Sequence, residues 1–170
     1  MSTVHLHLLL NHVPVIGMVI GLFLLAWAVV RRDQGLARVT LGLFAILAVV
    51  VLATFLTGEP AEEAVEGLAG VTEGTIERHE EAALLATIAL GVLGALSLGA
   101  LARFRRRPLP HGVSALLLAV ALVPAGAMGW AANLGGQIRH SEIRAGAPVP
   151  VSDAQMAGQR GGEEEEGEER

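Results

Sequence analysis

The chain has 170 residues, of which 52% are hydrophobic and 17% are charged, and its formal net charge at pH 7 is −5. The apolar share exceeds that of a typical soluble domain, and the acidic balance does not favour a nucleic-acid partner. The sequence has no Cys, which excludes disulfides, iron–sulfur clusters, thiolate zinc sites and covalently attached c-type haem. Composition alone allows a buried soluble core or a membrane protein, and the order of the residues decides between them.

Four long apolar stretches follow one another along the chain, at residues 13–30, 39–56, 75–103 and 113–134. Each contains a run of roughly 18 to 23 mostly apolar residues, which is enough for a helix to cross a hydrocarbon core of about 30 Å. The sequence therefore predicts an all-α fold, a four-transmembrane-helix bundle in residues 1–144. The lipid bilayer is its first expected partner.

Prolines and glycines mark particular places in these spans. Pro14 lies near the start of the first span, where either the helix begins or a longer helix is kinked. Pro124 lies in the middle of the fourth span and predicts a kink there. Gly17 and Gly21 form a GxxxG pair, a pattern that permits another helix to approach closely.

The second and third spans are joined by a polar connection, residues 57–81, that holds eight carboxylates, one Arg and one His. Pro60 can open a short amphipathic helix there, because apolar and acidic residues fall on opposite faces. The apolar positions are Ala61, Ala64, Val65 and Leu68, and the acidic ones are Glu62, Glu63 and Glu66. After residue 144 the chain turns to Pro, Gly, Ser and Glu without apolar periodicity, so residues 145–170 are expected to form a disordered acidic tail.

Arginine is unevenly distributed between the two sides of the predicted bundle. The short loops after the first and third spans hold seven Arg: Arg31, Arg32, Arg38, Arg103, Arg105, Arg106 and Arg107. The positive-inside rule places these loops in the cytoplasm. Both termini and the polar connection are therefore expected outside, which means the periplasm for a protein of the bacterial inner membrane.

Five of the six His lie on the acidic side of the predicted bundle, and only His111 lies in an arginine-rich loop. The five are His5, His7, His12, His79 and His140. Ionisable groups at a membrane boundary are costly, so a cluster supplied by several helices is a functional candidate. His79 is expected to point into the bundle because it shares a helix face with the mostly small residues Ala82, Ala83, Ala86 and Leu90. His5 and His7 lie near a fraying N-terminus and are expected to be ordinary interfacial residues.

The histidines permit two kinds of cofactor. Two imidazoles from different helices can hold b-type haem in a bundle, and the pair would be His12 with His79, with His140 as a substitute. Imidazole combined with carboxylate suits a divalent metal such as zinc or iron. That site would use His12, Glu59, Glu62, His79 and His140, although the HExxH and ExxH spacings are absent.

A third interpretation needs no cofactor. Histidines at helix ends are tolerated as interfacial residues, the acidic face is simply solvated, and the protein is a scaffold or a small subunit of a larger membrane complex. The sequence shows no nucleophile–base pairing and no phosphate-binding loop, so enzyme activity is not expected. A transporter is disfavoured because the spans carry no charge in mid-membrane.

Four segments carry a resemblance to a known group of proteins. HLLLNHVPVIG, TGEPAEE, ERHEEAA and ANLGGQIRHSEIR resemble a family of bacterial four-helix integral membrane proteins of unknown function, over residues 5–144. The resemblance implies a small inner-membrane protein and no particular reaction. It draws attention to residues inside the matching segments, which are His12, Glu59, Glu62, His79, Gly135, Gly136 and His140.

The sequence therefore predicts a small bacterial inner-membrane protein that binds haem b or a divalent metal at its outer face. Its expected role is that of an accessory redox or respiratory subunit. The alternative is a cofactor-free structural membrane protein. Other membrane-protein subunits or a second copy of the chain are the expected protein partners.

Overall fold

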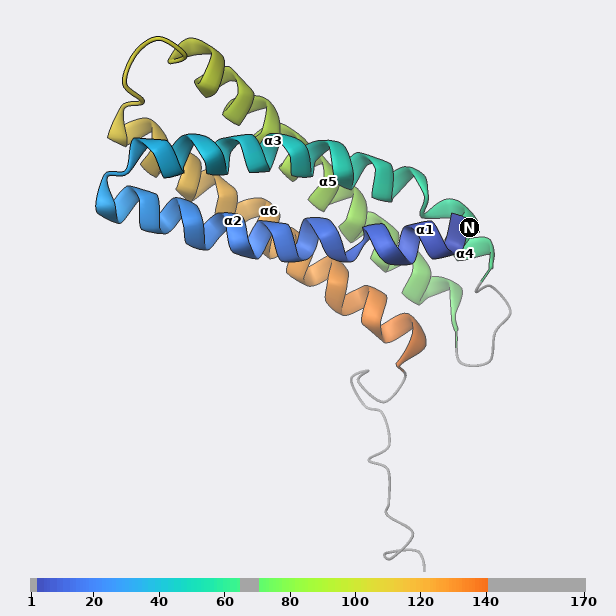
Figure 1. The fold of residues 1–170 in the computed structure, drawn as a ribbon. Helices are drawn as coiled ribbons and strands as arrows, with labels where there is room; N and C mark the ends of the chain where they lie inside the picture. The colour runs from blue at the N-terminus through green and yellow to red at the C-terminus, as the bar shows by residue number, and fades with distance from the viewer. Residues whose placement is uncertain (1–2, 65–70, 141–170) are drawn as a thin grey trace, which may run out of the picture. The chain divides into compact units, whose positions relative to one another are not determined.

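Four long helices and two short ones make up the described part of the chain, residues 3–64 and 71–140 of the computed structural model. In chain order they are α1 (Thr3–Leu10), α2 (His12–Arg31), α3 (Gln34–Leu56), α4 (Glu59–Glu63), α5 (Glu73–Arg103) and α6 (His111–Arg139) (Figure 1). The described residues contain no β-strand. The predicted all-α bundle, with a short helix between the second and third spans, is confirmed. The predicted tail, residues 145–170, lies outside the described residues.

The four long helices form a closed ring in which each packs against two others. α2 packs against α3, α3 against α5, α5 against α6, and α6 against α2. Successive long helices run in opposite directions, so the connections alternate between the two ends of the bundle (Figure 1). The short helices α1 and α4, the start of α5 and the end of α6 lie at one end, here called the acidic end. The α2–α3 turn and the α5–α6 loop lie at the other, here called the arginine end.

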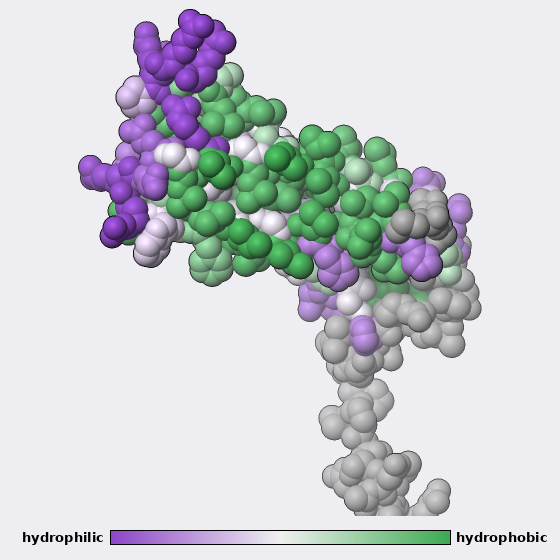
Figure 2. Space-filling model, in the orientation of Figure 1, coloured by the Kyte–Doolittle hydropathy of each residue, from purple (hydrophilic) through white to green (hydrophobic). Residues whose placement is uncertain are grey.

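The outer surface of the bundle is apolar. Large side chains cover it, and Phe23 and Val30 on α2 are 74% and 76% exposed. Figure 2 shows this apolar belt, with polar side chains gathered towards the ends. Water would not tolerate so large a patch, whereas lipid tails solvate it. Four segments are long and apolar enough to cross a membrane, namely Val4–Arg31, Gln34–Leu56, Glu73–Arg103 and His111–Ile138. The protein is therefore a multi-pass membrane protein.

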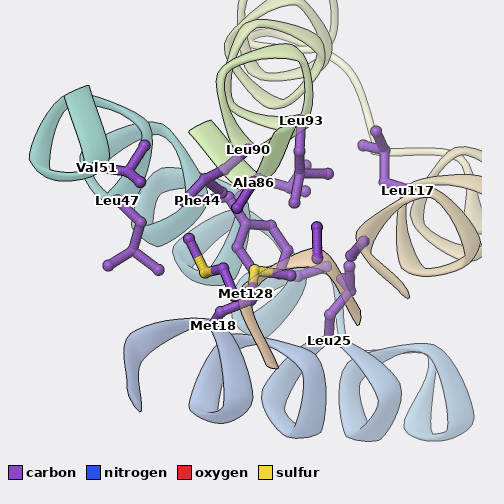
Figure 3. Close-up of a cluster of buried hydrophobic side chains, with 14 of the residues drawn as sticks. Met18, Leu25, Phe44, Leu47, Val51, Ala86, Leu90, Leu93, Leu117 and Met128 are labelled. Atoms are coloured by element: carbon purple, nitrogen blue, oxygen red, sulfur yellow. The ribbon is translucent and has the colours of Figure 1, made fainter. Parts of the chain in front are cut away.

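The interior of the bundle is built around Phe44 of α3, whose ring is fully buried among apolar side chains of the neighbouring helices (Figure 3). Glycines let those helices approach. Gly21 of α2 lies against the Phe44 ring, and an added Cβ on Gly17 would lie 2.6 Å from Leu47. On α5, an added Cβ on Gly94 would lie 3.3 Å from the Phe44 carbonyl oxygen. Both members of the GxxxG pair are thus at close helix contacts.

The first span is one long helical segment interrupted at Asn11. α1 ends at Leu10 and α2 begins at His12, so Pro14 is the third residue of α2. Proline has no N–H and cannot bond to the carbonyl of Leu10, four residues before it. Asn11 nevertheless keeps helical angles, φ −62° and ψ −28°, and its N–H donates to the His7 carbonyl at 2.9 Å. α1 therefore continues roughly along α2 (Figure 1).

The spans differ in length. α3 has 23 residues and α5 has 31, so at 1.5 Å per residue they are about 35 Å and about 46 Å long. A hydrocarbon core is about 30 Å thick, and α5 exceeds it by about three turns. The first turns of α5 are the polar ones, carrying Glu73, Glu77, Glu80 and Glu81. The acidic end therefore includes helix that need not lie in hydrocarbon.

Candidate functional site

His7 of α1 points towards the last turns of α3 at the acidic end. Its Nδ1 lies 3.1 Å from the carbonyl oxygen of Thr54 and 3.3 Å from the hydroxyl of Thr57. Because a carbonyl oxygen only accepts hydrogen bonds, Nδ1 carries the proton and donates it. In the neutral ring Nε2 then keeps a free lone pair. The half-buried His7 is thus held against α3 in one tautomer.

His79 of α5 makes the equivalent contact with α6. Its Nδ1 lies 2.9 Å from the carbonyl oxygen of Ala131, so Nδ1 again donates and Nε2 keeps a lone pair. The ring rests on Gly135, where an added Cβ would lie 3.0 Å from Cε1 and 3.2 Å from Nδ1. His79 is half-buried against a neighbouring helix, which confirms its predicted inward orientation.

Two half-buried histidines from different helices, His7 and His79, lie at the acidic end and are here called the histidine pair. Asn11, one turn after His7, has its amide Oδ1 buried without a hydrogen-bond partner among the residues described. α1 and α3 thus supply one histidine–carbonyl contact at the acidic end, and α5 and α6 supply the other.

His12 differs from His7 in its surroundings. It is exposed, and its Nδ1 lies 3.1 Å from the carbonyl oxygen of Leu8 in the same helical segment. The sequence favoured His12 over His7, whereas in the structure His7 is the half-buried one of the two. The sequence contained a signal for this, because His7 lies seven residues before the buried Pro14 and eleven before the buried Met18, which places all three on one helix face. His12 lies off that face.

The carboxylates predicted to bind a metal lie on or beside α4. Glu59 is exposed in its first turn, and Glu62 is partly buried. Across residues 3–64 and 71–140, no three His, Asp or Glu side chains are grouped so as to hold a metal ion. His140 follows the last residue of α6, is exposed, and belongs to a separate unit, His140–Arg170. The five-residue metal set and the ligand roles of His12 and His140 stay predictions.

Comparisons with known protein families, with curated proteins and with solved structures found no match. The resemblance of four sequence segments to a bacterial membrane family therefore stays a prediction. The architecture is established independently of it, by four apolar helices that are long enough to span a bilayer.

The donor set of the histidine pair suits one kind of cofactor better than another. A histidine that binds a metal usually donates its other ring nitrogen to a carbonyl or carboxylate, which orients the ring and raises its basicity. Both His7 and His79 meet that condition. Haem iron is held by one or two protein ligands, whereas zinc sites use three or four. Two imidazoles are a sufficient number of ligands for b-type haem, whereas a divalent metal would need a further one.

Proposed function

We propose that this membrane bundle binds b-type haem at its acidic end, where His7 and His79 would hold the iron, and that it transfers electrons as an accessory subunit of a larger redox assembly. One observation carries the proposal. Each ring gives its Nδ1 proton to a backbone carbonyl of a neighbouring helix, which leaves two Nε2 atoms as ligands. When bound, haem would supply one-electron chemistry.

The chain's own residues would orient the two ligands from four helices. The Thr54 carbonyl ties His7 to α3, and the Ala131 carbonyl ties His79 to α6. Both anchors are backbone groups, so the ring orientations do not depend on the rotamer of a partner side chain. Gly135 keeps the space that the His79 ring occupies. These are the positioning features that a ligand pair requires.

The orientation that we propose places the acidic end on the periplasmic side of a bacterial inner membrane. Its support is the seven Arg at the opposite end of the bundle, because cytoplasmic loops carry an excess of basic residues. In this orientation an electron partner would reach the histidine pair from outside the cell membrane.

A cofactor-free structural protein is the second candidate, and the same hydrogen bonds favour it. They join α1 to α3 and α5 to α6, and each contributes about 0.5–1.5 kcal/mol net. In that case His7 and His79 act only as ties between helix ends. Their loss would lower stability without changing any spectrum.

An absorption spectrum of the detergent-purified protein, produced with ample haem and recorded oxidised and dithionite-reduced, separates the two candidates. The haem proposal expects a Soret band that sharpens with α and β bands on reduction, and its loss in His7→Ala and in His79→Ala. His12→Ala and His111→Ala are matched controls that should retain the band. If the wild-type protein shows no Soret band, the haem proposal is refuted and the structural one is favoured.

The pattern of variants tests the ligand assignment separately. If His12→Ala or His140→Ala removes the haem and His7→Ala retains it, the ligands chosen from the sequence are correct and those chosen from the structure are wrong. Metal analysis of the same sample covers the remaining possibility. Stoichiometric zinc or iron without a Soret band would mean that a further ligand completes a site with the histidine pair.

A further inference from the structure

At the arginine end, hydrogen bonds join the α2–α3 turn and the start of α3 to the α5–α6 loop. Gln34 at the start of α3 accepts a hydrogen bond from the backbone N–H of Leu109 at 3.1 Å. Arg38 donates through Nη2 to the carbonyl oxygens of Phe104 and Arg107, at 2.8 and 2.7 Å. Leu109 is 1% exposed and belongs to the hydrophobic core. The α5–α6 loop is therefore held in a defined shape against the α2–α3 turn.

This surface carries a strong positive charge. Arg38 is engaged with the loop, and the other Arg at this end are exposed. Those exposed residues are Arg31, Arg32, Arg103, Arg105, Arg106 and Arg107. The one carboxylate among the described residues here is Asp33, whose side chain accepts from the Leu36 N–H at 3.0 Å and caps α3. All the described Glu residues belong to the acidic end.

Two of the arginines lie over aromatic rings. The guanidinium carbon of Arg31 is 5.8 Å from the ring centre of Trp27, and that of Arg103 is 5.4 Å from the ring centre of Phe104. Trp27 is 62% exposed on the apolar outer surface, one turn before Arg31. The Arg31 side chain is therefore bent back towards the membrane, to the level where lipid phosphates and interfacial Trp residues meet.

We infer that the arginine end binds the headgroup of an anionic phospholipid. Arginine presents a planar fork that matches phosphate oxygens in two parallel hydrogen bonds, and clusters of basic residues beside a membrane span bind acidic lipids. A lipid is the ligand rather than free phosphate, because the cationic surface adjoins apolar helix faces that acyl chains cover. The positive-inside rule accounts for the charge but not for a loop clamped by Arg38 or for Arg31 folded onto Trp27.

Equilibrium binding of phosphatidylglycerol to the full-length protein, measured by native mass spectrometry from detergent, tests the inference. Phosphatidylcholine and inorganic phosphate serve as comparison ligands. Phosphatidylglycerol should bind more tightly than phosphatidylcholine. The triple replacement Arg105→Gln, Arg106→Gln, Arg107→Gln should weaken it on the order of 100-fold, since each basic residue near a membrane surface contributes about five-fold. The matched control replaces three exposed carboxylates of the acidic end and should change nothing: Glu77→Gln, Glu80→Gln, Glu81→Gln.

Three results would overturn the inference. Equal affinity for the two lipids would exclude recognition of the anionic headgroup, and competition by inorganic phosphate at the same concentration would indicate a free-anion site. Unchanged affinity in the glutamine triple variant would exclude these arginines. If that variant fails to insert, the corresponding lysine triple keeps the charge and the topology but lacks the fork, so it should bind several-fold more weakly. Full affinity in the lysine variant would equally refute recognition by arginine.

Discussion

Gly135 of α6 leaves room for the ring of His79, and Gly135→Ala tests that contact. The new Cβ would lie 3.0 Å from Cε1 and 3.2 Å from Nδ1, so the ring must shift by a few tenths of an ångström. The shift strains the 2.9 Å hydrogen bond to Ala131, whose net contribution is about 1 kcal/mol. Alanine favours a helix over glycine by about 1 kcal/mol. The two effects oppose each other, and we expect the free energy of unfolding to stay nearly unchanged.

Gly129 on the same helix supplies the matched control, because an added Cβ there meets nothing within 4 Å. Gly129→Ala should gain only the helix preference of alanine over glycine. Its free energy of unfolding should therefore exceed that of Gly135→Ala by about 1 kcal/mol. Unfolding in mixed detergent micelles, followed by circular dichroism, measures the difference. In a His79→Ala background the two glycine variants should become equally stable. Equal shifts already in the wild-type background would refute the placement of His79 against Gly135.

Two further predictions concern the scaffold. Gly94→Leu should destabilise the bundle by about 1–3 kcal/mol, because α3 backbone lies 3.3 Å from an added Cβ and overpacking is costly. Gly91→Leu, with nothing within 4 Å, should be nearly neutral in the same unfolding assay, and an equal loss there would contradict the close approach of α3 and α5. Arg38→Gln should speed hydrogen exchange of the α5–α6 loop amides, because it removes two charge-assisted bonds worth about 1.5–3 kcal/mol each. Exposed Arg105→Gln should leave that exchange rate unchanged, and a similar increase would mean that Arg38 does not hold the loop.

The four spans were predictable because a helix in lipid is apolar on its outer face as well as its inner one. On α2, Leu25 is fully buried and Phe23 is 74% exposed, yet both are apolar. For the same reason, hydropathy says little about which face of a span points inward. The ring order of α2, α3, α5 and α6 depends on particular contacts, such as Gly94 beside α3, and those contacts carry no periodic signal.

At the acidic end, prediction succeeded where small residues marked the inner face. His79 shares its stripe with the buried Ala82 and Ala86, and its inward orientation followed from that. His7 lies among leucines in α1, where the inner stripe becomes visible only when it is followed down to Pro14 and Met18. The sequence-based choice set His7 aside because it lies near the N-terminus, and selected His12 instead. α4 has only five residues, too few for a periodicity to indicate where its carboxylates lie.

The length of α5 makes bilayer thickness a variable for the surroundings of His79. From Arg103 back to His79 the helix rises about 36 Å. With Arg103 at one surface of a core of about 30 Å, the His79 ring stands about 6 Å above the other, among hydrated headgroups. A bilayer thicker by that amount would draw the ring into hydrocarbon, where no water can replace its hydrogen bond to the Ala131 carbonyl. Acyl-chain length in the surrounding membrane would then adjust how much the acidic end depends on that one bond.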